Sequence, residues 1–137
     1  NNEGEVMLKN SKNLLSETLK SSYYEYMIDH LQESLVVINS NYEIADANEI
    51  FVTKYNTSQP IGMKCYEITH SYDKPCFNYG VRCPLKEVIE NKIPVEVLHK
   101  HKIEGQTIWE NIVAFPLLSK NGETKHIIET FRDVSDL

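Results

Sequence analysis

The stretch SLVVINSNYEIADANEIFVTKY, residues 34–55, contains three successive patterns of apolar side chains. Its first six residues form an apolar, β-branched run that Ser40-Asn41 ends, and residues 42–48 then alternate, so two short strands are predicted. Asp46 or Asn48 can cap a helix after them, whose one face would carry Ile50, Phe51 and Tyr55. Two strands leading into a short helix are therefore expected to open the folded domain.

The sequence after residue 83 predicts one more helix and three strands. Residues 84–92 form an amphipathic helix with Cys83 at its cap and Pro84 at its first position. The three strands are predicted at 94–103, 107–118 and 124–134, and Asn121-Gly122 is a strong hairpin signal between the last two. The fold class is therefore α+β: a five-stranded antiparallel sheet with small helices on one face.

Residues 5–33 predict a long amphipathic helix before this domain, because they contain neither Pro nor Gly and carry an apolar residue at every fourth position: Leu15, Leu19, Tyr23, Met27 and Leu31. A coiled coil of two chains through residues 5–32 would cover this stripe and make the protein a homodimer. The alternative is that the helix folds back over the domain. The predicted domains are a dimerisation helix at 1–32 and a sensor domain at 33–137.

The charge and composition of the chain argue against several classes of binding partner. The 137 residues carry a net charge of −6 and no basic stripe, which argues against nucleic acid or an anionic membrane surface. The longest apolar runs, such as residues 35–38, are too short to cross a bilayer. Three cysteines fit poorly with a secreted disulfide framework, so we expect a cytoplasmic protein. Asn1 is not a natural start, which suggests an excised piece of a longer chain.

The order of elements resembles a PAS domain over residues 33–137, and three motifs carry the resemblance. Residues 34–55 resemble the family's opening, with an N-x-x-F-like turn from Asn48 to Phe51. Ile61-Gly62 resembles its "IGK" step, and RDVS, residues 132–135, resembles its "RDIT" signature. The resemblance implies a sensory input domain of a two-component histidine kinase, a diguanylate cyclase or a transcription regulator, with a downstream effector domain as partner.

No phosphate-binding loop, nucleophile elbow or paired-carboxylate motif is visible, so the segment is not expected to be an enzyme. The final strand would pass the signal on, with Asp133 and Ser135 anchoring it to the helix that follows through bonds from side chain to backbone. The alternative is that both residues belong to a solvated strand end.

The loop-like stretch 64–85 gathers all three cysteines with a histidine, spaced Cys65-x4-His70-x5-Cys76-x6-Cys83. Three thiols and an imidazole suit a tetrahedral zinc ion or an iron–sulfur cluster, although no C-x-x-C pair is present. A reversible Cys76–Cys83 disulfide and inert structural thiols are the alternatives. Redox state, a metal ion or a small ligand are therefore the candidate cues.

Two details bear on this stretch. Cys83 at a helix N-terminus, with Arg82 beside it and Lys64 beside Cys65, predicts thiolate-favouring surroundings. The elements Cys65-Tyr66-Glu67 with His70, Pro75-Cys76 and Cys83-Pro84-Leu85 also resemble a cysteine-bearing PAS subgroup. His99 and His101 share one strand face and could supply an alternative ligand, although strand histidines are more often exposed.

Three other ligands fit the sequence less well. A flavin adduct would use Cys65 after Gly62, but the residues that follow, YEIT, differ from the flavin-binding pattern. Haem would bind through His70 or a strand histidine. A small-molecule pocket could be lined by the aromatic side chains of Phe51, Trp109, Phe115 and Phe131, which are otherwise ordinary core residues.

Overall fold

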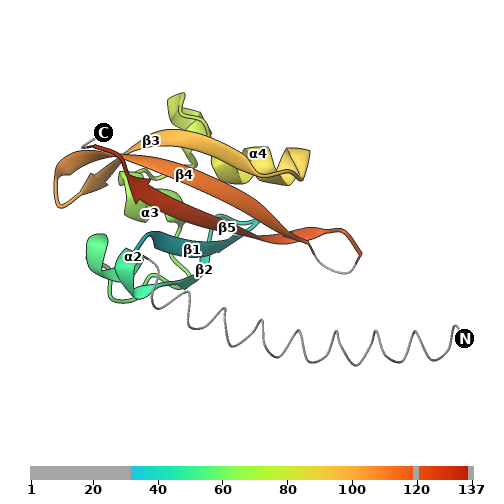
Figure 1. Cartoon of the computed structure of the whole chain (residues 1–137), viewed down its shortest axis with the longest axis horizontal. Coiled ribbons are helices and arrows are strands. Elements are labelled where there is room, and N and C mark those ends of the chain that lie inside the picture. Colours follow the sequence, from blue (N-terminus) through green and yellow to red (C-terminus); the bar gives the residue numbers. More distant parts are fainter. Residues whose placement is uncertain (1–31, 119–120, 136–137) are drawn as a thin grey trace, which may run out of the picture. The chain divides into compact units, whose positions relative to one another are not determined.

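The computed structural model describes residues 32–118 and 121–135. Five antiparallel strands form one sheet in the order β2-β1-β5-β4-β3 (Figure 1). The strands are β1 (Ser34–Asn39), β2 (Ile44–Ala47), β3 (Val95–Ile103), β4 (Gln106–Leu118) and β5 (Thr124–Asp133). The predicted fold class is confirmed for the sheet and its short helices. The predicted helix at 1–32 lies outside the described residues apart from Gln32.

Alternation of side chains decides which face of the sheet is buried. In β3 the buried residues are Val97, His99 and His101, and the residues between them are exposed. In β5 they are Ile127, Glu129 and Phe131. The chain reverses between β3 and β4 through Glu104-Gly105, whose φ angles of 50° and 78° are the left-handed values of a type I′ hairpin turn.

The first helix, α2 (Glu49–Lys54), is held to the sheet by its cap. Asn48, rather than Asp46, is the cap, and its Oδ1 accepts from the backbone N–H groups of Phe51 and Leu35, each at 3.0 Å. Its Nδ2 donates to the Glu33 carbonyl at 2.9 Å. One buried amide therefore joins the start of α2 to the start of β1.

The stretch 64–85 is more regular than the expected loop. It contains α3 (Cys65–His70) and the 3-10 helix η1 (Cys76–Tyr79), and it leads into α4 (Pro84–Asn91). Cys83 caps α4 and Pro84 is its first residue, as predicted. Elements of four to six residues are too short to show a helical period, so sequence periodicity could not find α3 and η1.

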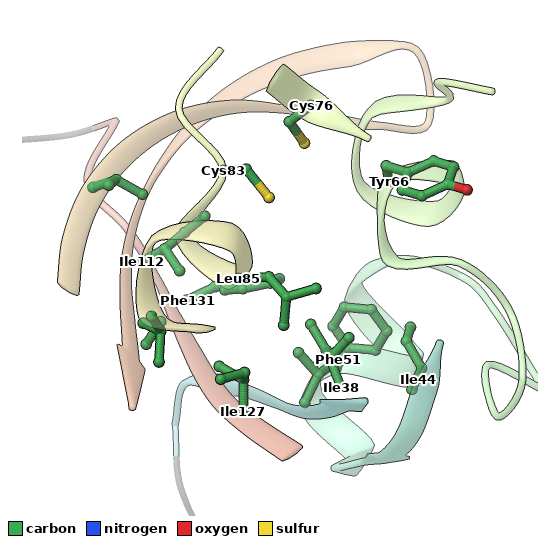
Figure 2. Packing of buried hydrophobic residues seen from close by; sticks show 14 residues of the cluster. Ile38, Ile44, Phe51, Tyr66, Cys76, Cys83, Leu85, Ile112, Ile127 and Phe131 are labelled. Carbon is green, nitrogen blue, oxygen red and sulfur yellow. The ribbon is translucent and has the colours of Figure 1, made fainter. Parts of the chain in front are cut away.

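Figure 2 shows the core that forms between these helices and the inner face of the sheet. Phe51 of α2, Tyr66 of α3 and Leu85 of α4 meet Ile112 and Phe131 of the sheet there, and Cys76 and Cys83 belong to the same cluster. None of the helices within residues 32–118 and 121–135 has the length and apolar character needed to span a bilayer.

Candidate functional site

A cavity of about 20 Å³ lies between α3, η1, α4 and the inner face of the sheet. Its wall includes every residue of the predicted metal set, together with two further histidines and a carboxylate: Cys65, His70, Cys76, Cys83, His99, His101 and Glu129. We call it the Cys–His cavity. A space of this size suits a single water molecule or ion, whereas pockets for drug-sized ligands typically have about 300–1,000 Å³.

Local structure explains why these side chains meet. Cys65 and His70 are the first and last residues of α3, Cys76 is the first of η1, and Cys83 caps α4. The histidines of β3 come to the same place because period-two alternation puts both on the inner face. The shared face of His99 and His101 is thus confirmed, but they are buried, with only 3% and 1% of their surfaces exposed.

The three imidazoles form the tightest group in the cavity. One ring nitrogen from each of His70, His99 and His101 lies within 4.8 Å of those of the other two. His70 Nε2 is 3.3 Å from His99 Nδ1, and the ring centroids of His70 and His101 are 4.6 Å apart. The sequence suggested His70 as the ligand beside the cysteines and His99 or His101 only as an alternative, because the packing of α3 on β3 is not visible in spacing.

The outer nitrogens of the β3 histidines have hydrogen-bond partners. His99 Nε2 donates to the Arg82 carbonyl, and His101 Nδ1 lies 2.9 Å from Glu110 Oε1. Because a carboxylate only accepts hydrogen bonds, Nδ1 of His101 carries the proton in this pair. Each partner sets the tautomer of its ring and leaves the other nitrogen without a proton; that of His99, Nδ1, lies 3.3 Å from His70 Nε2 and accepts its hydrogen bond.

Burial keeps the imidazoles neutral. Burial and the neighbouring imidazoles lower the pKa of His70 to about 3, and burial with the charge of His101 lowers the pKa of His99 to about 4. Burial also lowers the pKa of His101, against the opposing effect of Glu110. Neutral imidazole is the form that binds metal ions.

The cysteines do not have the thiolate-favouring surroundings that the sequence predicted. Burial raises the pKa of Cys76 to about 12 and that of Cys83 to about 11, and it raises the pKa of Cys65 well above its ordinary value. Backbone amides at the start of α4 lower the pKa of Cys83 but do not outweigh burial. All three are free thiols.

The two cations expected beside the thiols are directed elsewhere. The Arg82 guanidinium pairs with Glu87, with Nη2 2.6 Å from Oε1, and Lys64 Nζ donates to the Asn41 carbonyl at 2.8 Å. Adjacency in sequence therefore did not place a positive charge on the sulfur atoms.

Glu129 is a residue of the site that the sequence reasoning missed. It is 5% exposed and lines the cavity from β5, and burial raises its pKa to about 8. Among residues 32–118 and 121–135 no hydrogen-bond donor or cation is found on its carboxyl group. The signal was available, since Glu129 lies at period two between the apolar Ile127 and Phe131.

The four aromatic residues proposed to line a ligand pocket are not brought together. Phe51 and Phe131 are buried, with ring centroids 6.0 Å apart, and only Phe131 borders the Cys–His cavity. Trp109 and Phe115 are 40% and 38% exposed. They lie on the outer face of β4 because they alternate with the buried Glu110, Ile112 and Ala114.

A buried polar network leads away from the cavity. Glu110, whose side chain is fully buried, accepts from His101, from the Tyr55 hydroxyl and from Lys54 Nζ at 3.0 Å. Burial alone would raise the pKa of Glu110, but these donors hold it below its ordinary value. Lys54 Nζ also lies 3.9 Å from Asp133 at the end of β5. We call these residues the Glu110 network.

Asp133 and Ser135 both accept backbone hydrogen bonds at the end of β5, and the expected link to a following helix lies outside the described residues. Asp133 Oδ1 accepts from the Ser135 N–H at 2.9 Å, and Ser135 Oγ accepts from the Trp109 N–H at 3.1 Å. The side chains thereby tie the exit of the domain to β4.

Several solved structures are similar to this chain. The PAS domain of a protein from Colwellia psychrerythraea has a TM-score of 0.70 at 18% identity, and the match covers 85% of this chain and 98% of that one. A sensory box sensor histidine kinase from Vibrio cholerae has a TM-score of 0.57 at 20% identity, covering 93% and 92%. The LOV protein of Rhodobacter sphaeroides has a TM-score of 0.64 at 9% identity, covering 81% and 64%. Comparison with curated proteins finds no match.

At these identities the structural likeness shows the fold alone. The sequence profile of the family described as "PAS fold" matches residues 28–137, which is most of the chain and includes all five strands and the Cys–His cavity. The chain belongs to the PAS fold family.

Proposed function

We propose that this chain is a signal-sensing input domain and that the Cys–His cavity is its sensing site. The observation that carries the proposal is the gathering of three thiols, three neutral imidazoles and a carboxyl group in one buried space. Burying so many polar groups costs free energy unless they are paired or bind something. Perturbed ionisable groups gathered in a cavity are typical of functional sites.

The size and chemistry of the cavity favour a metal ion among the candidate cues. About 20 Å³ accommodates an ion but not a haem or a flavin. Thiols with pKa values of about 11 and 12 are almost entirely protonated at neutral pH, and thiolate is the form that reacts with oxidants. These values argue against a Cys76–Cys83 disulfide switch, and they favour the neutral imidazoles over the thiols as ligands of an ion, because a thiol must lose its proton before it binds a metal.

The signal would leave through β5. Glu129 and Phe131 of this strand border the cavity, and the strand ends at Asp133, which the Glu110 network also reaches. A change at the cavity would therefore alter the packing of β5 and the bonds at its end. The paired helices at 5–32, which would make the protein a homodimer, remain part of this proposal and lie outside the described residues.

The downstream partner is proposed from the family and its relatives. A solved relative is named a sensor histidine kinase, which supports an effector domain of that type in the full-length protein. A diguanylate cyclase and a transcription regulator are the alternatives that the family resemblance offers. We further propose that the segment itself has no catalytic activity and works in the cytoplasm. The likeness of its cysteine motifs to a PAS subgroup belongs to this proposal as well.

The test is hydrogen exchange on anaerobically purified protein, with metal and sulfide content and an absorption spectrum measured first. Amide protection in β5 and residues 132–135 is compared with and without Zn²⁺, and with and without hydrogen peroxide. In the oxidant arm two thiols would form a disulfide, losing two protons and two electrons to one peroxide molecule, which becomes two water molecules.

We expect at least one of these cues to change amide protection in β5 of the wild-type chain. The same cue should have no effect in a variant that carries four substitutions together: Cys65→Ser, Cys76→Ser, Cys83→Ser and His99→Gln. If neither Zn²⁺ nor peroxide changes β5, the sensing proposal is wrong. Stoichiometric zinc that leaves β5 unchanged would instead indicate an interaction module with a structural ion.

A further inference from the structure

The histidines of the Cys–His cavity come from two elements that meet only in the folded domain. His70 ends α3, whereas His99 and His101 lie two residues apart on the inner face of β3. Two nitrogens bound to one tetrahedral zinc ion, with bonds of about 2.05 Å, lie about 3.3 Å apart. His70 Nε2 and His99 Nδ1 are 3.3 Å apart, and each of the three histidines has a ring nitrogen within 4.8 Å of one from each of the other two.

We propose that His70, His99 and His101 bind one divalent transition-metal ion of the zinc type, with the fourth coordination position facing the thiols of the cavity. This inference rests on the proposed function, since the ion would be the cue that the domain senses. It differs from the set expected from the sequence, in which three cysteines and His70 were the ligands.

The partners of the histidines support this assignment. Ligating histidines usually donate their second ring N–H to a carboxylate or a backbone carbonyl, which fixes the ring for the metal. His99 does so to the Arg82 carbonyl and His101 to Glu110, which is itself held by Lys54.

Glu129 supplies an independent observation. It is a 95% buried carboxyl group, since only 5% of the residue is exposed, and it lies on the same cavity. Among the described residues that form the cavity wall none is lysine or arginine, so the wall offers electron pairs but no cation. A divalent ion would give this buried carboxyl group the partner that the cavity wall does not supply.

The donor set decides the class of ion. Calcium and magnesium prefer oxygen ligands, whereas imidazole and thiol suit zinc, cobalt, nickel, copper and iron. An iron–sulfur cluster needs several thiolates and more room than about 20 Å³, so a single ion fits this cavity better. A surface cleft of about 330 Å³ borders His70 and His99 and provides a route for the ion from solvent.

Binding of the metal ion would also affect the end of β5, where the chain leaves the domain. An ion on Nε2 of His101 makes its Nδ1–H a stronger donor to Glu110. Glu110 shares Lys54 with Asp133, where β5 ends. A change in charge at the cavity is thereby connected to the strand that carries the signal.

The experiment is a titration of the whole chain with Co²⁺, followed by its visible absorption, with competition by Zn²⁺. We expect one equivalent to give the intense bands of tetrahedral cobalt. His99→Gln and His101→Gln should each weaken cobalt binding by more than about 100-fold. Loss of a residue that only hydrogen-bonds to a metal ligand already weakens metal sites by about 10–100-fold, and here a ligand itself is lost. His126→Gln is the matched control, because His126 lies on the opposite face of β5 and should bind normally.

X-ray absorption of the wild-type zinc complex tests the ligands without any variant. Three imidazoles around zinc would support the inference. One imidazole with three sulfur ligands, or cobalt binding that survives in both glutamine variants, would overturn it and leave the sensing proposal standing. Absence of any binding would also overturn it, and the hydrogen-exchange response to peroxide would then decide the sensing proposal separately.

Discussion

Replacing Glu110 by alanine tests whether the Glu110 network stabilises the folded domain. The Glu110 side chain is fully buried and is the common acceptor for His101, Tyr55 and Lys54. Removing one partner of a buried ion pair typically costs about 3–5 kcal/mol, because the other charge stays buried without compensation.

The expected cost here lies at or below the lower end of that range. Lys54 is 26% exposed and also lies 3.9 Å from Asp133, so its charge can move towards water. Tyr55 Oη is 2.8 Å from His101 Nδ1, so these two groups can hydrogen-bond to each other once the carboxylate is gone. The remaining cost is the loss of charge-assisted hydrogen bonds to Glu110, each worth about 1.5–3 kcal/mol. Part of this cost is offset, because the variant no longer has to bury a carboxylate. We expect about 2–3 kcal/mol of destabilisation, or roughly 8–15 °C in the unfolding midpoint.

The assay is urea unfolding at pH 7, followed by circular dichroism and by the fluorescence of Trp109, the only tryptophan of the chain. Glu87→Ala is the matched control. It also removes a glutamate from an ion pair, but its partner Arg82 is 63% exposed, so the midpoint should barely move. If Glu110→Ala were no more destabilising than Glu87→Ala, the Glu110 network would not be a stabilising structure and the argument would be refuted.

Three further predictions concern the core, the cap and acid. Phe51→Ala should cost about 3–5 kcal/mol in urea unfolding, because the ring is fully buried, and a loss below about 1 kcal/mol would contradict the core assignment. Asn48→Ala should cost about 2–4 kcal/mol, since it removes the cap of α2 and leaves the Leu35 N–H unpaired; unchanged amide exchange at Leu35 would count against this. Stability should fall as pH drops from about 6.5 to about 4, because the unfolded chain takes up protons on His70 and His99 that the folded chain, with pKa values of about 3 and 4, does not. The slope for these two groups approaches about 2.7 kcal/mol per pH unit. Glu129 opposes it by about 1.4 kcal/mol per pH unit, because its raised pKa of about 8 lets the folded chain hold a proton that the unfolded chain releases. We therefore expect a net fall of about 1.4 kcal/mol per pH unit, and stability that does not fall between pH 7 and 5 would show that the imidazoles are not buried neutral.

The fold could be predicted well because its signals are local. Alternation at 94–103 and 124–134 reports directly which residues face the core, and Pro84 after Cys83 marks the start of α4. These patterns arise from backbone geometry within a few residues, so a single sequence contains them. The helices α2 and α3 both have six residues, but only α2 begins with a capping side chain, Asn48, so the start of α3 had no local signal.

The site could be predicted only in part, for two physical reasons. Burial decides ionisation, and no sequence pattern reported that the Cys83 thiol would lie in the core with Arg82 turned away to Glu87. The packing of helices on strands decides which side chains meet, and the distance between His70 and His99 depends on how α3 packs on β3.

By itself, the sequence determined the PAS architecture and the presence of a cluster of cysteines with a nearby histidine, because hydrophobic period and spacing are properties of neighbouring residues. Only the tertiary structure decided that three imidazoles and Glu129 share the cavity with the thiols and that Glu110 connects it to Asp133. These contacts join residues that are 9 to 79 positions apart in the chain, from His101 with Glu110 to Lys54 with Asp133. Such contacts exist only once helices and sheet have packed around a common core.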